Sequence, residues 1–109
     1  MTRTILIADD HPLFRQALKL AVSRAAPDAV VIEAGQLCEA VDAVRGAERL
    51  DLILLDLMLP DVQGFAGLAM LRAIRPAATI AIVSGREEPA VVAQAQALGA
   101  KGFIPKSSS

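Results

Sequence analysis

Residues 52–64 read LILLDLMLPDVQG, an apolar run that ends in an aspartate and a proline-containing loop. The run 50–55 is apolar except for Asp51 and shows none of the alternation expected of a strand with one wet face. It therefore predicts a strand buried on both faces, as in a parallel sheet covered by helices. Asp56 stands at the end of this strand, and the stretch from Pro60 to Gly64 is predicted to be a loop.

The same kind of pattern extends in both directions along the chain. Apolar strand-like runs occur at 4–8, 29–34, 79–83 and 101–104. Between these runs, apolar residues recur at helical spacing after Pro12, over 37–46, from Phe65 to the residue before Pro76, and from Val91 to Gly99. Strand–helix alternation predicts one open α/β sheet of parallel strands with right-handed crossovers.

The composition narrows the class of protein. A length of 109 residues, of which 54% are hydrophobic, suits a single domain with its own core. No apolar run reaches the roughly 18 residues that span a bilayer. Cys38 is the only cysteine, so no internal disulfide can form, which suits a reducing, cytoplasmic setting. With a net charge of −1 and no basic stripe, the domain is not expected to contact nucleic acid directly.

Polar residues follow four of the five predicted strands. Ligands bind at the carboxyl ends of the strands in sheets of this kind, so these residues should converge on one edge. Each has an ordinary explanation when taken alone, as a helix cap, a turn residue or a solvated charge. Together they form a set that predicts a site: Asp9, Asp10, Asp56, Ser84 and Lys106.

Three carboxylates on one edge repel one another, and a divalent cation would relieve that repulsion. Ligands that are all oxygen suit Mg²⁺, which keeps several of its waters. We expect Asp10 and Asp56 to bind the metal directly, together with the backbone carbonyl of Met58. Asp9 would act through a metal-bound water.

Asp56 is also a candidate nucleophile toward phosphorus, giving an aspartyl phosphate. Lys106 would supply a positive charge to a phosphoryl oxygen, and the hydroxyl of Ser84 would hydrogen-bond another. Gly85 would leave room for the group. His11, between the acidic pair and Pro12, is interpreted as a loop residue.

These residues resemble the receiver domain of response regulators in two-component signalling. The resemblance rests on ILIADDHPLFR (5–15), LILLDLMLPDVQG (52–64), IAIVSG (80–85) and GFIPK (102–106). It implies a flavodoxin-like, CheY-like doubly wound sheet of five parallel strands in the order 2-1-3-4-5. It further implies that a sensor histidine kinase or a small phosphodonor phosphorylates Asp56. Phosphotransfer and autodephosphorylation would then be self-catalysed, without conventional enzyme activity.

The resemblance also implies a switch. Ser84 and Phe103 match the family's switch residues, and Pro105 matches a position that follows a cis peptide bond. The segments DDHPLFRQAL (9–18) and GFIPKSS (102–108) are similar to the LuxR/NarL-like subfamily, whose output is a helix-turn-helix DNA-binding domain. That similarity implies control of transcription through an output domain outside these residues, and a homodimer on activation. Gln63 departs from the pattern, since an acidic residue is common there.

We expect residues 1–109 to form one receiver domain that lacks the family's fifth helix and any output domain. On the first helix, the positions that can face the sheet are Phe14, Leu18, Ala21, Val22 and Ala25. Leu13, Ala17 and Leu20 lie to one side, where a following helix would normally pack. An apolar flank of this kind predicts self-association, which an added helix would reduce.

Other functions share parts of this pattern. An aspartate-nucleophile phosphatase needs a second acidic residue two positions after the nucleophile, where Met58 stands. A flavin or nucleotide binder would carry a glycine-rich phosphate loop after the first strand, where Asp9 and Asp10 stand. A phosphorylation-independent interaction module is compatible with the sequence but has no need of the five polar residues.

Overall fold

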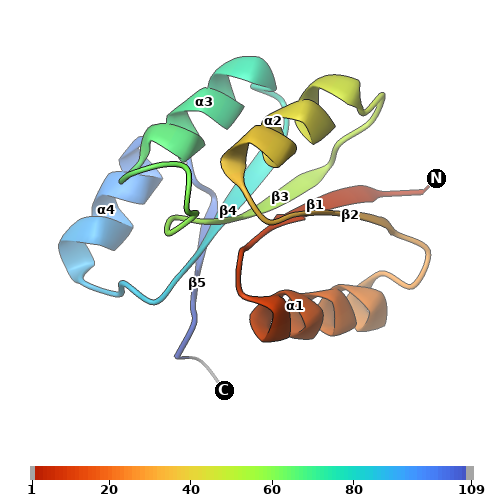
Figure 1. Cartoon of the computed structure of the whole chain (residues 1–109), viewed down its shortest axis with the longest axis horizontal. Helices are drawn as coiled ribbons and strands as arrows, with labels where there is room; N and C mark the ends of the chain where they lie inside the picture. Colours follow the sequence, from red (N-terminus) through yellow and green to blue (C-terminus); the bar gives the residue numbers. More distant parts are fainter. Residues whose placement is uncertain (1, 108–109) are drawn as a thin grey trace.

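Five parallel strands form one sheet in the order β2-β1-β3-β4-β5 in the computed structural model, which describes residues 2–107 (Figure 1). The strands are β1 (Thr4–Ala8), β2 (Val30–Ala34), β3 (Leu52–Asp56), β4 (Thr79–Ser84) and β5 (Gly102–Pro105). The predicted fold class and strand order are confirmed. Strand ends differ from the predicted ones by one or two residues. For example, the N–H of Ala29 closes a turn onto the carbonyl of Ala26, so β2 begins at Val30.

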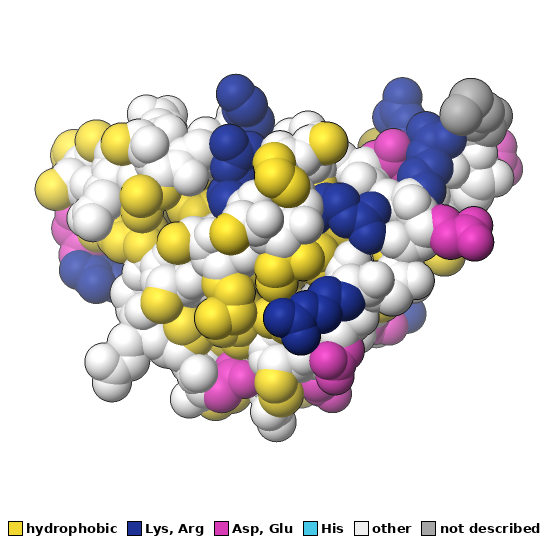
Figure 2. Space-filling model, turned by 90° about the horizontal axis from the view of Figure 1, so that it is seen from above, with side chains coloured by type: hydrophobic (Ala, Val, Ile, Leu, Met, Phe, Trp, Pro, Cys, Tyr) yellow, Lys and Arg dark blue, Asp and Glu magenta, His cyan; other side chains and the backbone are white. Residues whose placement is uncertain are grey.

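Four helices cover the two faces of the sheet unequally. Figure 1 shows α1 (Pro12–Ala25) alone on one face, and α2 (Leu37–Gly46), α3 (Ala66–Ile74) and α4 (Pro89–Ala97) on the other. Figure 2 views the molecule from the side of α2 and α3, where apolar side chains reach the surface among lysines and arginines. Met70 of α3 and Leu98, just after α4, are large apolar side chains that remain exposed.

The central strands contribute to two cores. Leu6, Ile53 and Ile82 lie in the larger core beneath α2, α3 and α4. Ile7 and Leu54 lie in the smaller core beneath α1. Successive strand residues point to opposite faces, so both sets must be apolar, which explains the missing alternation. The edge strands β2 and β5 are only partly buried.

On α1, only part of the predicted sheet-facing set is buried. Leu18 and Val22 are buried and Phe14 packs against them, but Ala21 and Ala25 are exposed, contrary to prediction. Ala21 and Ala25 lie on the same side of the helix, three positions after Leu18 and Val22, but their single-carbon side chains are not part of the core beneath α1. The flanking Leu13 and Leu20 are 88% and 55% exposed.

The peptide bond before Pro105 is trans, and no cis peptide bond occurs among residues 2–107. The cis bond implied by the family resemblance is therefore wrong for this structure. With the trans bond, Pro105 pairs with Ser84 in the sheet, and the N–H of Lys106 donates to the carbonyl of Ser84 at 2.8 Å. The trans form of an X–Pro bond is favoured by about 0.5–1 kcal/mol, and the pairing of β5 with β4 forms with the bond in this isomer.

Candidate functional site

All five predicted polar residues lie at the carboxyl edge of the sheet. Asp9 and Asp10 follow β1, Asp56 is the last residue of β3, and Ser84 is the last residue of β4. The three strands are neighbours, and Lys106 enters from the end of β5. The alternation of strand and helix thus brings together side chains that are up to about a hundred positions apart.

Backbone amides hold the two buried carboxylates in place. Asp9 Oδ1 accepts the N–H of His11 at 2.7 Å, and Asp56 Oδ1 accepts the N–H of Met58 at 2.9 Å. Both aspartates are almost completely buried. The second oxygen of each carboxylate, Oδ2, accepts no backbone N–H, so it can contact a cation while Oδ1 anchors the side chain.

Lys106 supplies the positive charge between these carboxylates. Its Nζ lies 2.9 Å from Asp56 Oδ2 and 3.0 Å from Asp9 Oδ2, and its side chain is only 15% exposed. Burial of the ammonium opposes its charge, but the contacts with Asp56 and then Asp9 outweigh burial and raise the pKa of Lys106. The ammonium also lies 5.0 Å from the centre of the Phe14 ring, within cation–π range.

A cavity of about 440 Å³ opens above the carboxylates, lined by Asp10, His11, Asp56, Met58, Gly85, Arg86 and Lys106. A Cβ placed on Gly85 would meet no atom within 4 Å, so the space predicted beside that residue is present. Ser84 is fully buried, and its Oγ accepts the N–H of Arg86 at 3.0 Å. The hydroxyl hydrogen of Ser84 is therefore left to donate elsewhere.

The side chains of Met58 and Phe103 differ in their surroundings. Met58 is 56% exposed and lines the cavity, which is compatible with a role for its backbone alone. Phe103 pairs with Ile82 across β4 and β5 and packs, partly buried, against the larger core. Its ring therefore stands at a boundary between core and surface.

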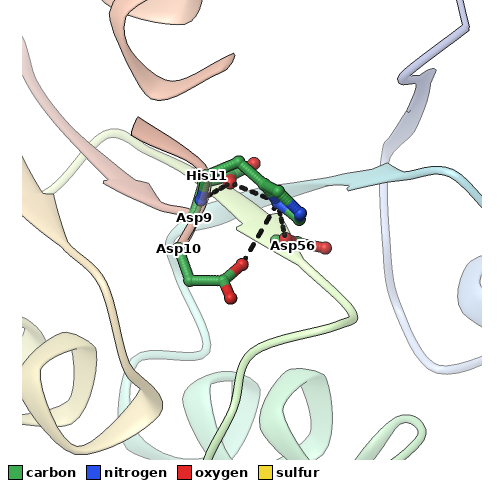
Figure 3. A group of neighbouring side chains, drawn as sticks. All are labelled: Asp9, Asp10, His11 and Asp56. Carbon is green, nitrogen blue, oxygen red and sulfur yellow. Dashed lines mark hydrogen bonds and ion pairs between the residues drawn. The ribbon is translucent and has the colours of Figure 1, made fainter. Parts of the chain in front are cut away.

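His11 takes a place that sequence reasoning did not assign. It is a loop residue at the start of α1, as interpreted, but its imidazole lies among the carboxylates (Figure 3). Nδ1 lies 3.2 Å from Asp10 Oδ1, 3.3 Å from Asp9 Oδ1 and 3.7 Å from Asp56 Oδ2. Its position directly after the acidic pair was the available signal.

Arg15 and Asp61, two further residues that the sequence did not single out, brace the loops of the site. Arg15 donates to the carbonyl of Asp9 at 2.7 Å and to Glu33 Oε1 at 3.1 Å, tying the acidic loop to β2. Asp61 accepts the backbone N–H groups of Leu37 and Cys38, the first residues of α2. Since each pairing spans different elements, sequence spacing carried no sign of either.

The donor set fits a divalent metal. Asp9, Asp10, His11 and Asp56 each offer one atom, and the four atoms lie within 4.8 Å of one another. Among the described residues, the buried atoms Asp9 Oδ2 and Asp10 Oδ1 receive no hydrogen bond, although Lys106 forms an ion pair with the former. Buried anionic oxygens without donors are stabilised by a cation.

Comparison with known proteins identifies the class that this fold and site define. The family model described as "Response regulator receiver domain" matches residues 5–109, and the chain belongs to this family. A "Glycerol metabolism activator" of Pseudomonas putida is 45% identical over 104 residues, covering 95% of this chain and 47% of that protein. The chain thus spans about half the length of the curated relatives it matches.

Solved structures of response regulators are similar in fold to this chain. A two-component response regulator of the LuxR family from Aurantimonas sp. has a TM-score of 0.86 at 32% identity, covering 100% of this chain and 77% of that one. A response regulator from Burkholderia pseudomallei, solved with a phosphorylated aspartic acid, calcium ion and citrate, has a TM-score of 0.83 at 28% identity. That match covers 98% of this chain and 61% of the other. In residues 2–107, no helix combines the length and apolarity needed to cross a membrane.

Proposed function

We propose that Asp56 accepts a phosphoryl group and that the phosphorylated domain acts as a signalling switch. The observation that carries this proposal is the position of the Asp56 carboxylate. It is buried, oriented by the N–H of Met58, paired with Lys106 and open to the cavity. An anchored carboxylate beside a cation and an open cavity suits nucleophilic attack on phosphorus.

In the proposed step, an oxygen of Asp56 bonds to phosphorus while the bond from phosphorus to the leaving group breaks. The leaving group departs with that electron pair. Lys106 pairs with a phosphoryl oxygen, and the free hydroxyl hydrogen of Ser84 donates to another. Asp10, Asp56 and the carbonyl of Met58 would hold Mg²⁺, with Asp9 acting through water. The bound metal would neutralise charge on the transferring group.

The switch in this proposal joins Ser84 to Phe103. If Ser84 turns toward the phosphoryl group, space opens behind it, and the partly buried ring of Phe103 moves inward. The surface formed by α4 and β5 would then change as a shift between two populated states.

The partners follow from the same proposal. A sensor histidine kinase, or a small phosphodonor, would supply the phosphoryl group. A LuxR family DNA-binding response regulator from Silicibacter pomeroyi, 33% identical to this chain with a TM-score of 0.82, supports an output that binds DNA. We further propose that a homodimer forms on activation. This domain itself would not contact DNA.

Intact mass spectrometry after incubation with acetyl phosphate, with and without Mg²⁺, tests the proposal. We expect a single Mg²⁺-dependent phosphoryl adduct that is lost in base. Asp56→Asn should abolish it, while the control Asp42→Asn, on the exposed side of α2, should not. An unchanged adduct in Asp56→Asn would refute Asp56 as the acceptor. No adduct in any variant would favour a phosphorylation-independent module.

A further inference from the structure

We propose that Arg15 is a positioning residue, which raises the metal affinity of the site by fixing the backbone of Asp9. The inference rests on the proposed function, because it concerns the metal site that this function needs. Its basis is a guanidinium that joins the loop after β1 to the end of β2, outside the group of metal donors.

The guanidinium of Arg15 bridges two acceptors from different elements. Nη1 donates to the backbone carbonyl of Asp9 at 2.7 Å, and Nε donates to Glu33 Oε1 at 3.1 Å. Because the guanidinium is planar and its N–H groups point in fixed directions, one orientation of the side chain serves both acceptors. Arg15 is itself part of α1, so the bridge also ties the acidic loop to that helix.

Asp9 is held to β2 through both its N–H and its carbonyl. The N–H donates to the carbonyl of Ala34 at 2.9 Å, and the carbonyl accepts from Arg15, which is in turn held by Glu33. Glu33 and Ala34 are the last two residues of β2. A Cβ on Gly35 would lie 3.4 Å from Nη1 of Arg15, so the guanidinium lies against the chain just after this strand. Two separate contacts therefore fix the loop after β1 to the end of β2.

The orientation of this loop determines whether the carboxylates converge. Asp9 and Asp10 follow the last residue of β1. Asp10 Oδ1 is buried and receives no hydrogen bond within residues 2–107, and it lies close to two other carboxylates. Like charges at this spacing repel, so without Arg15 the loop would relax toward wider separation when no metal is bound. Arg15 opposes that relaxation and keeps the carboxylates together before the metal arrives.

The sign of the effect separates positioning from simple electrostatics. Arg15 is a cation, and a nearby positive charge repels a divalent metal ion. If only charge mattered, removal of the guanidinium would strengthen Mg²⁺ binding. If the guanidinium positions the loop, its removal weakens Mg²⁺ binding, because the binding step must then bring the carboxylates together.

Lys19 provides a matched comparison on the same helix. Its Nζ lies 3.1 Å from Glu33 Oε2, so it pairs with the same carboxylate as Arg15. Within residues 2–107 its ammonium forms no hydrogen bond or ion pair with the acidic loop. Loss of Lys19 therefore removes the same charge without releasing Asp9.

Calorimetric titration of the metal-free protein with Mg²⁺ tests the proposal. Arg15→Met keeps an apolar stem but loses both hydrogen bonds, and we expect its Mg²⁺ affinity to fall about tenfold, as for residues that support a metal ligand. Lys19→Met should stay within about threefold of wild type, because exposed charges are screened. Unchanged or tighter Mg²⁺ binding in Arg15→Met, or an equal loss in Lys19→Met, would overturn the inference.

Arg15→Lys tests the bridge itself. Lysine keeps the positive charge but presents one ammonium in place of the planar fork, so it does not reproduce the two contacts with Asp9 and Glu33. Weaker Mg²⁺ binding in this variant would support a bridging role. Wild-type affinity would contradict it.

Two measurements on the metal-free protein separate positioning from general damage to the fold. The backbone carbonyl ¹³C resonance of Asp9 should shift in Arg15→Met and stay near its wild-type position in Lys19→Met. The melting temperatures of the two variants should be similar, because partly exposed ion pairs contribute little to stability. A large fall in melting temperature confined to Arg15→Met would indicate a structural role and contradict the proposal.

These outcomes are separate from those of the phosphorylation test. If the wild type gives the Mg²⁺-dependent adduct but Arg15→Met binds Mg²⁺ normally, only the role of Arg15 fails. If Arg15→Met binds Mg²⁺ more weakly but acetyl phosphate gives no adduct with the wild type, the positioning role stands and the proposed function fails. A wild type that binds no Mg²⁺ would overturn both.

Discussion

Lys106 Nζ lies 2.9 Å from Asp56 Oδ2, although fifty positions separate the two residues in the chain. The same ammonium lies 3.0 Å from Asp9 Oδ2. One cation therefore balances two buried carboxylates when no metal is bound. Lys106 thus has a structural role in the metal-free protein as well as its proposed role toward the phosphoryl group.

Lys106→Met should destabilise the metal-free protein. Removing the ammonium leaves two buried carboxylates without their cation. Since the side chain of Lys106 is partly exposed, we expect a loss of about 1–3 kcal/mol in the free energy of unfolding, less than for a fully buried pair. Saturating Mg²⁺ should restore part of the loss. Urea unfolding would measure both effects, with the exposed Lys101→Met as control. No change in Lys106→Met would contradict the ion-pair argument.

The pH dependence of this stabilisation follows from the raised pKa of Lys106, whose ordinary value is 10.5. A raised pKa in the folded state contributes stability that is complete below the unfolded pKa. That contribution is lost as the pH rises through the folded pKa. The difference in stability between wild type and Lys106→Met should therefore be constant near neutral pH and shrink only above about pH 10.5. Unfolding curves from pH 7 to 11 would show this.

Asp10→Ala should weaken Mg²⁺ binding and stabilise the metal-free protein. The substitution deletes a charged ligand of the proposed metal site. Loss of a residue that only supports a ligand already lowers metal affinity about 10–100-fold, so we expect Mg²⁺ affinity to fall more than about tenfold. It also removes repulsion, because Asp10 Oδ1 is buried without a hydrogen bond beside two other carboxylates. Calorimetry and thermal melts without Mg²⁺ test these effects, with Asp42→Ala as control. A lower melting temperature without metal would count against the repulsion.

Asp61→Ala should destabilise α2, whose first two N–H groups it caps at 2.6 and 2.9 Å. Asp61→Asn should retain most of the stability, because asparagine is also a good cap. The hydrogen bonds from Leu37 and Cys38 lower the pKa of Asp61. The stability contributed by its charge is thus complete above the unfolded pKa of about 3.9 and is lost as the pH falls through the folded value. Melts of both variants from pH 3 to 7 would reveal it.

Phosphorylation should alter the surface around Phe103. A stable phosphoryl mimic at Asp56 should change the amide chemical shifts of β5 and α4 in the wild type, because Ser84 and Phe103 would be repositioned. Asp56→Asn with the same reagent serves as control and should show no change. Identical spectra for the wild type with and without the mimic would refute the switch.

The apolar flank of α1 predicts self-association of residues 1–109. Leu13 and Leu20 are largely exposed, and burial of each would contribute about 1.5–3 kcal/mol. Sedimentation at tens of micromolar should show concentration-dependent association that the double variant Leu13→Gln, Leu20→Gln reduces. Met70→Gln, on the opposite side of the sheet, should not reduce it. A monodisperse wild-type monomer would show that this flank needs no partner.

Local patterns were sufficient for the strand and helix order, because buried strands and amphipathic helices differ in periodicity over short windows. Local patterns were not sufficient where packing against another part of the fold decides which residues are buried or which peptide isomer forms. Ala21 and Ala25 of α1 share the apolar character of Leu18, yet they stay exposed because their short side chains are not part of the core. The bond before Pro105 is trans although the family resemblance implied a cis bond. The same residues are compatible with either isomer, so the sequence did not decide between them.

The sequence by itself determined the α/β fold and the acidic edge, because strand ends in a parallel sheet must meet on one side. Tertiary structure alone placed the His11 imidazole among the carboxylates, and it alone brought Asp61 to the start of α2. It also set Lys106 between Asp9 and Asp56. These contacts depend on how separate loops lie against one another after the helices and strands have packed. Contacts between distant loops produce no periodic pattern in the sequence, so they could not be predicted from it.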